Sequence, residues 1–219
     1  MSHKSNGHEK ISTVNGSGIS CALDYLSQLG AVLRQMPHEQ VDEICDVLLR
    51  AYEKDRRIFL FGNGGSASLA SHFACDLGKG TTMGSDAKRF RAVALTDSIP
   101  MITAWANDRH YEDIFAEQLK NLIEPEDVAF AISASGNSPN VLKALQVARH
   151  AGGVCVALGG YDGGKMKPLC DFCLVVPSDN MQLIEDLHLS VAHALFTTIR
   201  HRLETGKLYA GLQLAAVVR

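Results

Sequence analysis

Short apolar runs alternate with amphipathic stretches from residue 57 onward, and this pattern predicts the fold. Five runs are apolar at consecutive positions, which is typical of strands covered on both faces of a sheet. They lie at 58–61, 92–95, 128–132, 154–158 and 172–176. Apolar residues spaced three or four apart predict helices at 66–78, 98–122 with a break near residue 107, 139–151 and 181–203. This alternation indicates an α/β fold, in which helices flank a doubly wound sheet of five parallel strands.

Two amphipathic segments precede the sheet, at residues 21–33 and 39–52, and Pro37 separates them. We expect two helices that form an N-terminal helical arm. Residues 1–18 contain almost no apolar side chains and are expected to form a flexible tail. The remaining chain is interpreted as a single domain over residues 19–203. A C-terminal extension follows at residues 204–219, and the sequence assigns it no role.

Composition and charge argue against a protein that mainly binds nucleic acid or a membrane. The 219 residues are 46% hydrophobic and carry a formal net charge of -3, as is typical of soluble globular proteins. Because no long Lys/Arg run occurs, neither nucleic acid nor an anionic membrane is expected as a partner. The one basic run, residues 88–91, is interpreted as a solvated loop before a strand. No apolar stretch reaches the roughly 20 residues of a membrane span, and no apolar signal segment follows Met1, so a cytoplasmic location is expected.

The cysteines are interpreted as reduced structural thiols of the core. All six are scattered through apolar segments and do not form a dense framework. Cys170 and Cys173 form the one closely spaced pair, but a zinc knuckle would need a second pair at similar spacing.

Two of the predicted strands end in the same kind of loop. Residues 62–66 read Gly-Asn-Gly-Gly-Ser, and residues 133–138 read Ser-Ala-Ser-Gly-Asn-Ser. Glycines let the backbone approach a ligand closely, Ser and Asn add hydrogen-bond donors, and the N-terminus of the following helix favours an anion. In a sheet of strand order 2-1-3-4-5, these loops flank the crevice where the crossover direction switches. We therefore expect a small phosphorylated ligand held by neutral donors.

Two other phosphate motifs fit less well. A Walker A loop ends in Gly-Lys-Ser/Thr, and neither loop has a lysine there. The first loop matches the dinucleotide fingerprint G-x-G-x-x-G/A, which expects an acidic residue about 20 positions later. Only Asp97, 35 positions after Gly62, is a candidate, and a nicotinamide cofactor would leave the second loop without a role.

Six short motifs, followed by His193, occur in a characteristic order between residues 21 and 203. They are Gly-Asn-Gly-Gly-Ser at 62–66, His-Phe-Ala at 72–74, Tyr-Glu-Asp-Ile-Phe at 111–115, Ser-Ala-Ser-Gly-Asn-Ser at 133–138, Asp-Gly-Gly-Lys-Met at 162–166 and Glu-Asp-Leu-His at 185–188. Together they resemble the sugar isomerase (SIS) family, and within it the phosphoheptose isomerases. The resemblance implies a SIS domain of flavodoxin-like strand order. It also implies an aldose-ketose isomerase that converts sedoheptulose 7-phosphate to D-glycero-D-manno-heptose 7-phosphate.

Acids and histidines occur at positions suited to this chemistry. An aldose-ketose isomerase moves a proton between C1 and C2 through an enediol, while a second group protonates or polarises the carbonyl oxygen. His72 and Asp76 are four residues apart and share one helix face, and Glu185 and His193 lie on the predicted C-terminal helix. Two imidazoles and two carboxylates suit Zn²⁺. Along the helix, however, Glu185 and His193 are separated by roughly 12 Å, and Glu185 and His188 form a tighter pair.

The family resemblance implies a role for each of these residues. It implies that His72, Asp76, Glu185 and His193 bind Zn²⁺, that Asp76 is the base and that His193 is the acid. The implied substrate contacts are Asn63, Gly64, Gly65, Ser66, Asp97, Ser133, Ala134, Ser135, Asn137, Ser138 and Gln182. It further implies a homotetramer with sites at subunit interfaces.

The sequence departs from the family pattern at four of these positions. Asp76 replaces a glutamate, Glu185 a glutamine, Ala134 a threonine and Gln182 an aspartate. The shorter Asp76 retracts its carboxylate while Glu185 adds one, so either carboxylate could be the base. Two alternatives stay open: an isomerase of another ketose phosphate, and a non-catalytic SIS protein that binds a phosphosugar or a replication-initiator partner.

Overall fold

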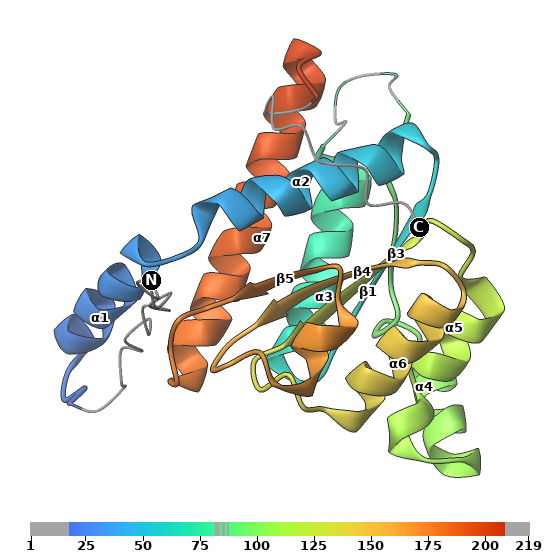
Figure 1. The fold of residues 1–219 in the computed structure, drawn as a ribbon, viewed down its shortest axis with the longest axis horizontal. Helices are drawn as coiled ribbons and strands as arrows, with labels where there is room; N and C mark the ends of the chain where they lie inside the picture. Colours follow the sequence, from blue (N-terminus) through green and yellow to red (C-terminus); the bar gives the residue numbers. More distant parts are fainter. Residues whose placement is uncertain (1–17, 82–83, 85, 87, 209–219) are drawn as a thin grey trace, which may run out of the picture.

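The five predicted strands form one parallel sheet, in the order β2-β1-β3-β4-β5 (Figure 1). The computed structural model describes residues 18–81, 84, 86 and 88–208. The strands are β1 (Arg57–Gly62), β2 (Arg91–Ala94), β3 (Val128–Ser133), β4 (Val154–Gly159) and β5 (Phe172–Val175). Each begins and ends within one residue of its predicted run. The α/β class and the flavodoxin-like strand order are confirmed.

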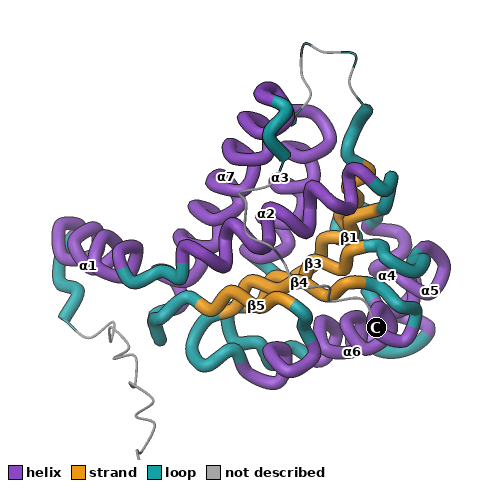
Figure 2. Tube along the Cα trace, turned by 45° about the horizontal axis from the view of Figure 1, so that its top comes forward, coloured by secondary structure: helices purple, strands orange, loops and turns teal. Residues whose placement is uncertain are grey.

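Helices cover both faces of this sheet (Figure 2). One layer contains α2 (His38–Glu53), α3 (Gly65–Cys75) and α7 (Met181–Thr205). The other contains α5 (Ala116–Leu122) and α6 (Pro139–His150), with α4 (Ile99–Asp108) beside them. The predicted N-terminal arm is present as α1 (Ala22–Arg34) and α2, with α1 extending away from the sheet.

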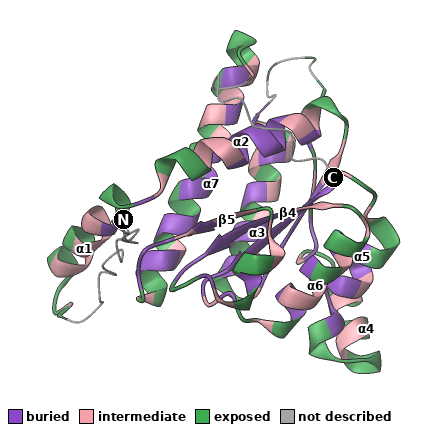
Figure 3. Ribbon diagram, in the orientation of Figure 1, coloured by how far each residue is buried: buried purple, intermediate pink, exposed green. Residues whose placement is uncertain are grey.

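Alternate side chains of the central strands face the two helix layers. Ile58 and Leu60 of β1 pack toward α2, α3 and α7, whereas Phe59 and Phe61 pack toward α5 and α6. Strands β1, β3 and β4 are therefore buried along almost their whole length (Figure 3). Burial on both faces explains why these runs are continuously apolar.

The helix predicted over residues 66–78 ends in a wider turn. α3 stops at Cys75, and the chain continues as a π-helical segment, Asp76–Gly80. Thr81 N–H donates to the carbonyl of Asp76 at 3.3 Å. A Cβ at Gly80 would lie 2.6 Å from the Phe196 ring of α7, so a larger residue here would force the ring to move. Apolar spacing does not distinguish a π turn from an α-helix, and π turns recur at functional sites.

Other boundaries differ slightly from the predicted ones. A 3-10 turn, Tyr111–Asp113, lies between α4 and α5, just after the predicted break. A second 3-10 segment, Gly164–Leu169, precedes β5 and was not predicted. α7 continues two residues beyond its predicted end. The predicted tail and extension fall largely on residues 1–17 and 209–219, which lie outside the described residues.

The cysteines follow the prediction only in part. All six are free thiols. Cys45 and Cys155 are buried, and burial raises the pKa of each to about 12, as suits inert core thiols. The expectation of a core position is wrong for Cys21 and Cys75, which are exposed because they lie at helix ends.

None of the helices in the described part of the chain has the length and apolar character needed to cross a membrane.

A buried ion pair joins α7 to α2. Arg202 donates from Nη1 to Asp46 Oδ1 at 2.5 Å and from Nη2 to Asp42 Oδ1 at 2.7 Å. Asp46 is fully buried, and Arg202 is 8% exposed. Desolvation raises the pKa of Asp46, although the guanidinium opposes this shift. Each charge thus depends on the other for compensation.

Removing one partner of this pair should destabilise the fold. We expect Arg202→Met to lower the free energy of unfolding by about 3–5 kcal/mol, because it leaves a buried carboxylate uncompensated. Urea denaturation measures this loss, and the double variant Arg202→Met/Asp46→Leu should recover much of it. Arg200→Met is the control, since Arg200 pairs with Glu204 on the surface and should cost less than about 1 kcal/mol. Equal losses for the two single variants would contradict the prediction.

Candidate functional site

The two glycine- and serine-rich loops lie side by side at the carboxyl edge of the sheet. β1 pairs with β3 in parallel, and Gly62 lies opposite Ile132. A Cβ at Gly62 would meet the Ile132 carbonyl at 2.6 Å and the Ser66 Cβ at 2.7 Å, so glycine is required for this close approach. Gly64 begins α3 with a φ of 54°, a conformation that glycine adopts most readily. The predicted juxtaposition of the loops is therefore observed.

The motif at residues 162–166 supports the second loop from behind. Gly136 has a φ of 62°, and a Cβ there would lie 2.1 Å from the Gly163 carbonyl. Met166 N–H donates to the Gly136 carbonyl at 2.9 Å. Asn137 adds a further link, because its Oδ1 accepts from Lys165 N–H at 3.1 Å. The motif thus holds the loop in shape, a role that the sequence did not reveal.

Three serines of the second loop lie near the start of α6. Ser133 Oγ and Ser138 Oγ are 3.5 Å apart, and Ser138 is the residue that directly precedes α6. Ser135 Oγ accepts from Asn137 N–H at 3.3 Å. Ala134 is buried, and its carbonyl accepts from Gly160 N–H at 2.9 Å. Hydroxyls near a helix N-terminus suit an anion.

Two residues that sequence reasoning missed fix the side chain of Asn63 in the first loop. Asn140, on the first turn of α6, exchanges two amide hydrogen bonds with Asn63, at 2.9 and 2.8 Å. The Tyr111 hydroxyl donates to Asn63 Oδ1 at 3.2 Å. These residues line a cavity of about 530 Å³ together with Ser138. The sequence did contain a signal for Asn140. It is a polar residue directly after Pro139, and the start of the helix that follows the second loop had to lie beside both loops.

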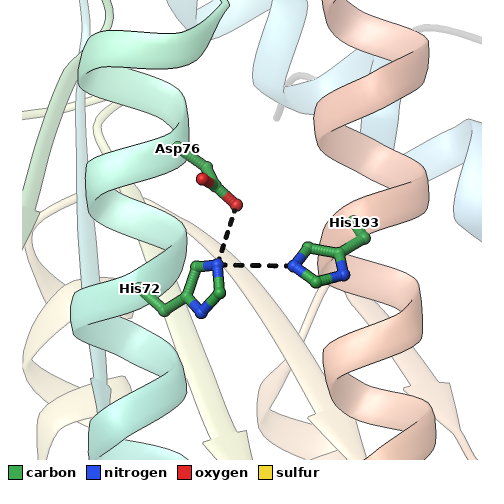
Figure 4. A group of neighbouring side chains, drawn as sticks. All are labelled: His72, Asp76 and His193. Carbon is green, nitrogen blue, oxygen red and sulfur yellow. Dashed lines mark hydrogen bonds and ion pairs between the residues drawn. The ribbon is translucent and has the colours of Figure 1, made fainter.

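Two histidines and an aspartate converge between α3 and α7 (Figure 4). His72 Nε2 lies 3.3 Å from Asp76 Oδ2 and 3.3 Å from His193 Nε2. The three ligand atoms are all within 4.8 Å of one another. In a tetrahedral zinc site with bonds of about 2.0 Å, neighbouring ligand atoms lie about 3.3 Å apart. Both distances from His72 match this value, and two imidazoles with a carboxylate suit the chemistry of a zinc ion.

Glu185 lies in the neighbouring pocket and outside this group of ligand atoms. Its two carboxylate oxygens lie 3.2 Å from the position that a Cβ on Gly65 would occupy, at the N-terminus of α3. The helix dipole favours a carboxylate there. The pocket has a volume of about 220 Å³ and is also lined by Ser66 and His72. Glu185 thus faces the same pocket as His72, from α7.

The remaining candidates differ in position. Asp97 follows β2, and its carboxylate accepts hydrogen bonds from Ser71 of α3 and from Thr96, so it lies near the first loop. Gln182 is exposed on the first turn of α7, where its N–H donates to Asn180 Oδ1.

His188 is a core residue and not a member of the metal group. It is 1% exposed, and its Nε2 lies 3.0 Å from the Gly159 carbonyl at the end of β4. Desolvation lowers its pKa to about 4, so the imidazole is neutral at neutral pH and Nε2–H is the donor.

Comparison with known proteins decides the family. A SIS domain model matches residues 24–160. The phosphoheptose isomerase of Helicobacter pylori (strain P12) is 41% identical over 177 residues, which cover 80% of this chain and 87% of the relative. That of Paramagnetospirillum magneticum is 41% identical over 186 residues, covering 85% and 94%. The chain belongs to the phosphoheptose isomerase family. The solved phosphoheptose isomerase of Neisseria gonorrhoeae has the same fold, with a TM-score of 0.76 at 30% identity over 82% of this chain and 96% of that chain.

Membership of the phosphoheptose isomerases confirms the resemblance that the ordered motifs indicated. It also confirms the enzyme class, since phosphoheptose isomerases are aldose-ketose isomerases. The ligand and substrate roles of individual residues stay predictions.

The buried His188 should make stability depend on pH. Because its pKa is about 4 in the folded protein and near 6.5 when unfolded, the unfolded chain binds the extra proton between these values. Stability should therefore fall as the pH falls from 6.5 to 4, by up to about 3 kcal/mol.

The measurement is urea denaturation across this pH range. His188→Gln keeps a donor for Gly159 and cannot be protonated, so its stability should vary less with pH. The control is His201→Gln, an exposed position on the same helix, which should retain the wild-type pH dependence. An unchanged profile for His188→Gln would contradict the prediction.

Proposed function

We propose that this protein isomerises sedoheptulose 7-phosphate to D-glycero-D-manno-heptose 7-phosphate through an enediol. The family and its enzyme class support this reaction. The observation that carries the proposal is the convergence of His72, Asp76 and His193 beside the pocket at the start of α3. An acid, a base and an anion-binding loop thus lie within one small region.

In this proposal the substrate phosphate binds at the two loops. Ser66, Ser133, Ser135 and Ser138 donate hydrogen bonds, and the N-termini of α3 and α6 direct partial positive charge toward the anion. The backbone N–H groups of the first loop add further donors. Neutral donors are sufficient, which agrees with a chain of net charge -3.

Conversion of a 2-ketose to an aldose moves one hydrogen from C1 to C2. Asp76 takes the proton from C1 and returns it to C2, while His193 protonates the carbonyl oxygen and then accepts the proton of the O1 hydroxyl. Asn63 and Asp97 contact the sugar. Glu185 faces the same pocket as His72 and is the second carboxylate able to act as base.

Zinc fits the same residues. Two imidazole Nε2 atoms at 3.3 Å face each other, and this arrangement suits either a shared proton or a shared cation. His72, Asp76 and His193 would hold Zn²⁺, with Glu185 as the predicted fourth ligand. A bound Zn²⁺ polarises the substrate carbonyl as a Lewis acid.

The proposal includes assembly and location. α1 exposes three leucines to solvent: Leu23 (71%), Leu26 (61%) and Leu33 (46%). Exposed apolar side chains grouped on one helix are typical of a surface that binds another protein chain. This surface supports the predicted homotetramer with sites at subunit interfaces. The predicted cytoplasmic location belongs to the same proposal.

Loss of either proposed proton-transfer group should abolish the reaction. We expect Asp76→Asn and His193→Ala each to reduce isomerisation by about a hundredfold or more, because a positioned acid or base contributes about 10²–10⁴-fold. The assay follows proton exchange at C1 across a panel of C5 to C8 ketose phosphates, which also identifies the preferred sugar. Asp108→Asn and His201→Ala, both at exposed positions, are the controls.

Glu185→Gln distinguishes the two carboxylates. If Asp76 is the base, Glu185→Gln retains a substantial fraction of the activity while Asp76→Asn loses it. The reverse outcome would assign the base to Glu185. Full activity in both Asp76→Asn and His193→Ala would contradict the proposed mechanism.

Zinc binding should depend on both histidines. We expect calorimetry to show one Zn²⁺ per chain for the wild type, and about a hundredfold weaker binding for His72→Ala, because the site loses one of its imidazole ligands. His201→Ala is the matched control. Zinc should also raise the melting temperature of the wild type, since it binds the folded chain preferentially. Unchanged zinc affinity in His72→Ala would remove the metal site from the proposal.

A further inference from the structure

Two side-chain amides join the first loop to the start of α6, the helix that follows the second loop. They lie outside the group formed by His72, Asp76 and His193. Asn63 follows β1 and is half-buried, and Asn140 begins α6 and is 2% exposed. Asn63 Nδ2 donates to Asn140 Oδ1 at 2.9 Å, and Asn140 Nδ2 donates to Asn63 Oδ1 at 2.8 Å. A buried reciprocal amide pair fixes both side chains, because rotation of either would break two hydrogen bonds.

A backbone group settles which end of each amide is which. Val141 N–H donates to Asn140 Oδ1 at 3.0 Å, and a backbone N–H can only donate. The neighbouring atom of Asn140 must therefore be Nδ2, and the atom that it faces on Asn63 must be Oδ1. The Tyr111 hydroxyl, 3.2 Å from the same Oδ1, then acts as a donor.

Counting hydrogen bonds shows what Asn63 can still offer. Its Oδ1 accepts from Asn140 and Tyr111, which occupies both lone pairs. One of its two Nδ2 hydrogens bonds Asn140. The other N–H has no partner among the described residues, and Asn63 lines the 530 Å³ cavity with Tyr111 and Ser138. Asn63 is therefore restricted to donating, so its complement in a ligand is an oxygen acceptor.

We propose that Asn140 is a positioning residue that holds Asn63 as a hydrogen-bond donor to an oxygen of the phosphorylated substrate, with Tyr111 completing the restraint. This inference rests on the proposed function, because it names a determinant of substrate binding at the same loops. Without Asn140, the Asn63 amide can rotate and present Oδ1, which repels phosphate oxygens because both groups are acceptors. Asn140 also links the first loop to α6, so the two halves of the phosphate site keep a fixed spacing.

A double-mutant cycle tests the inference, with Asn140→Leu, Asn63→Ala and the combined variant. The readouts are KM and kcat for sedoheptulose 7-phosphate and its Kd by calorimetry, which needs no turnover. Asn140→Leu should raise KM and Kd about tenfold while kcat changes less than about threefold, as expected for loss of one charge-assisted hydrogen bond. In the Asn63→Ala background, Asn140→Leu should have no further effect on Kd. Gln146→Leu, at an exposed position on α6, is the control.

Tyr111→Phe provides a second test that leaves the buried amide pair intact. Tyr111 is exposed, and the substitution removes the hydrogen bond that its hydroxyl donates to Asn63 Oδ1. We expect Kd to rise about twofold to fivefold, and only when Asn63 is present. A merely structural role for Asn140 would lower the melting temperature and weaken binding equally in both backgrounds, which would overturn the inference. An unchanged Kd in both Asn140→Leu and Tyr111→Phe would also overturn it.

The cycle separates this inference from the proposed reaction. If the wild type binds sedoheptulose 7-phosphate without converting it, the reaction fails while the Kd values still test Asn140. If the wild type binds no sugar phosphate of the panel, both proposals fall.

Discussion

β1 and β3 pair in parallel with Gly62 opposite Ile132, and so both strands deliver the chain to the same edge of the sheet. Each right-handed crossover then leaves in the opposite direction, α3 to one face and α6 to the other. A crevice opens between the two loops where the directions diverge. The two glycine- and serine-rich loops, the amide pair and the start of the helix that carries His72 all depend on this one pairing.

The second half of the site depends on how α7 is held. Its N-terminal half carries Glu185 and the buried His188, which bonds the end of β4. Its far end is fixed to α2 by the buried charge of Arg202. Between these contacts, Gly80 of the π segment lets α3 and α7 approach closely at Phe196. His193 is therefore held opposite His72 by packing on both sides of it along the helix.

The sequence predicted the elements well because their signals are local. Continuous apolar runs at 58–61 and 128–132 reflect burial on both faces, and the echo between the two loops indicated the switch point. His72 and Asp76 could be paired because four residues make one helical turn. These arguments need only the spacing of residues along the chain.

Contacts between distant elements could not be predicted in this way. The approach of His193 to His72 was implied by family resemblance and not by spacing. Glu185 lies over Gly65, and the role of Asn140 depends on a partner 77 residues away. The π turn and the exposed Cys21 and Cys75 were missed for a related reason, since apolar periodicity does not describe how a helix ends.

The side chains proposed to bind the phosphate carry no charge of their own. Asn63, Asn140 and the loop serines do not ionise in the physiological range. In the proposed function, a site of neutral donors therefore binds a phosphate dianion equally well whatever the protonation state of the proposed acid and base. It also releases few counterions on binding, so its strength varies little with ionic strength. The proposed site would thus retain a phosphorylated substrate at ionic strengths that weaken a site built from lysine or arginine.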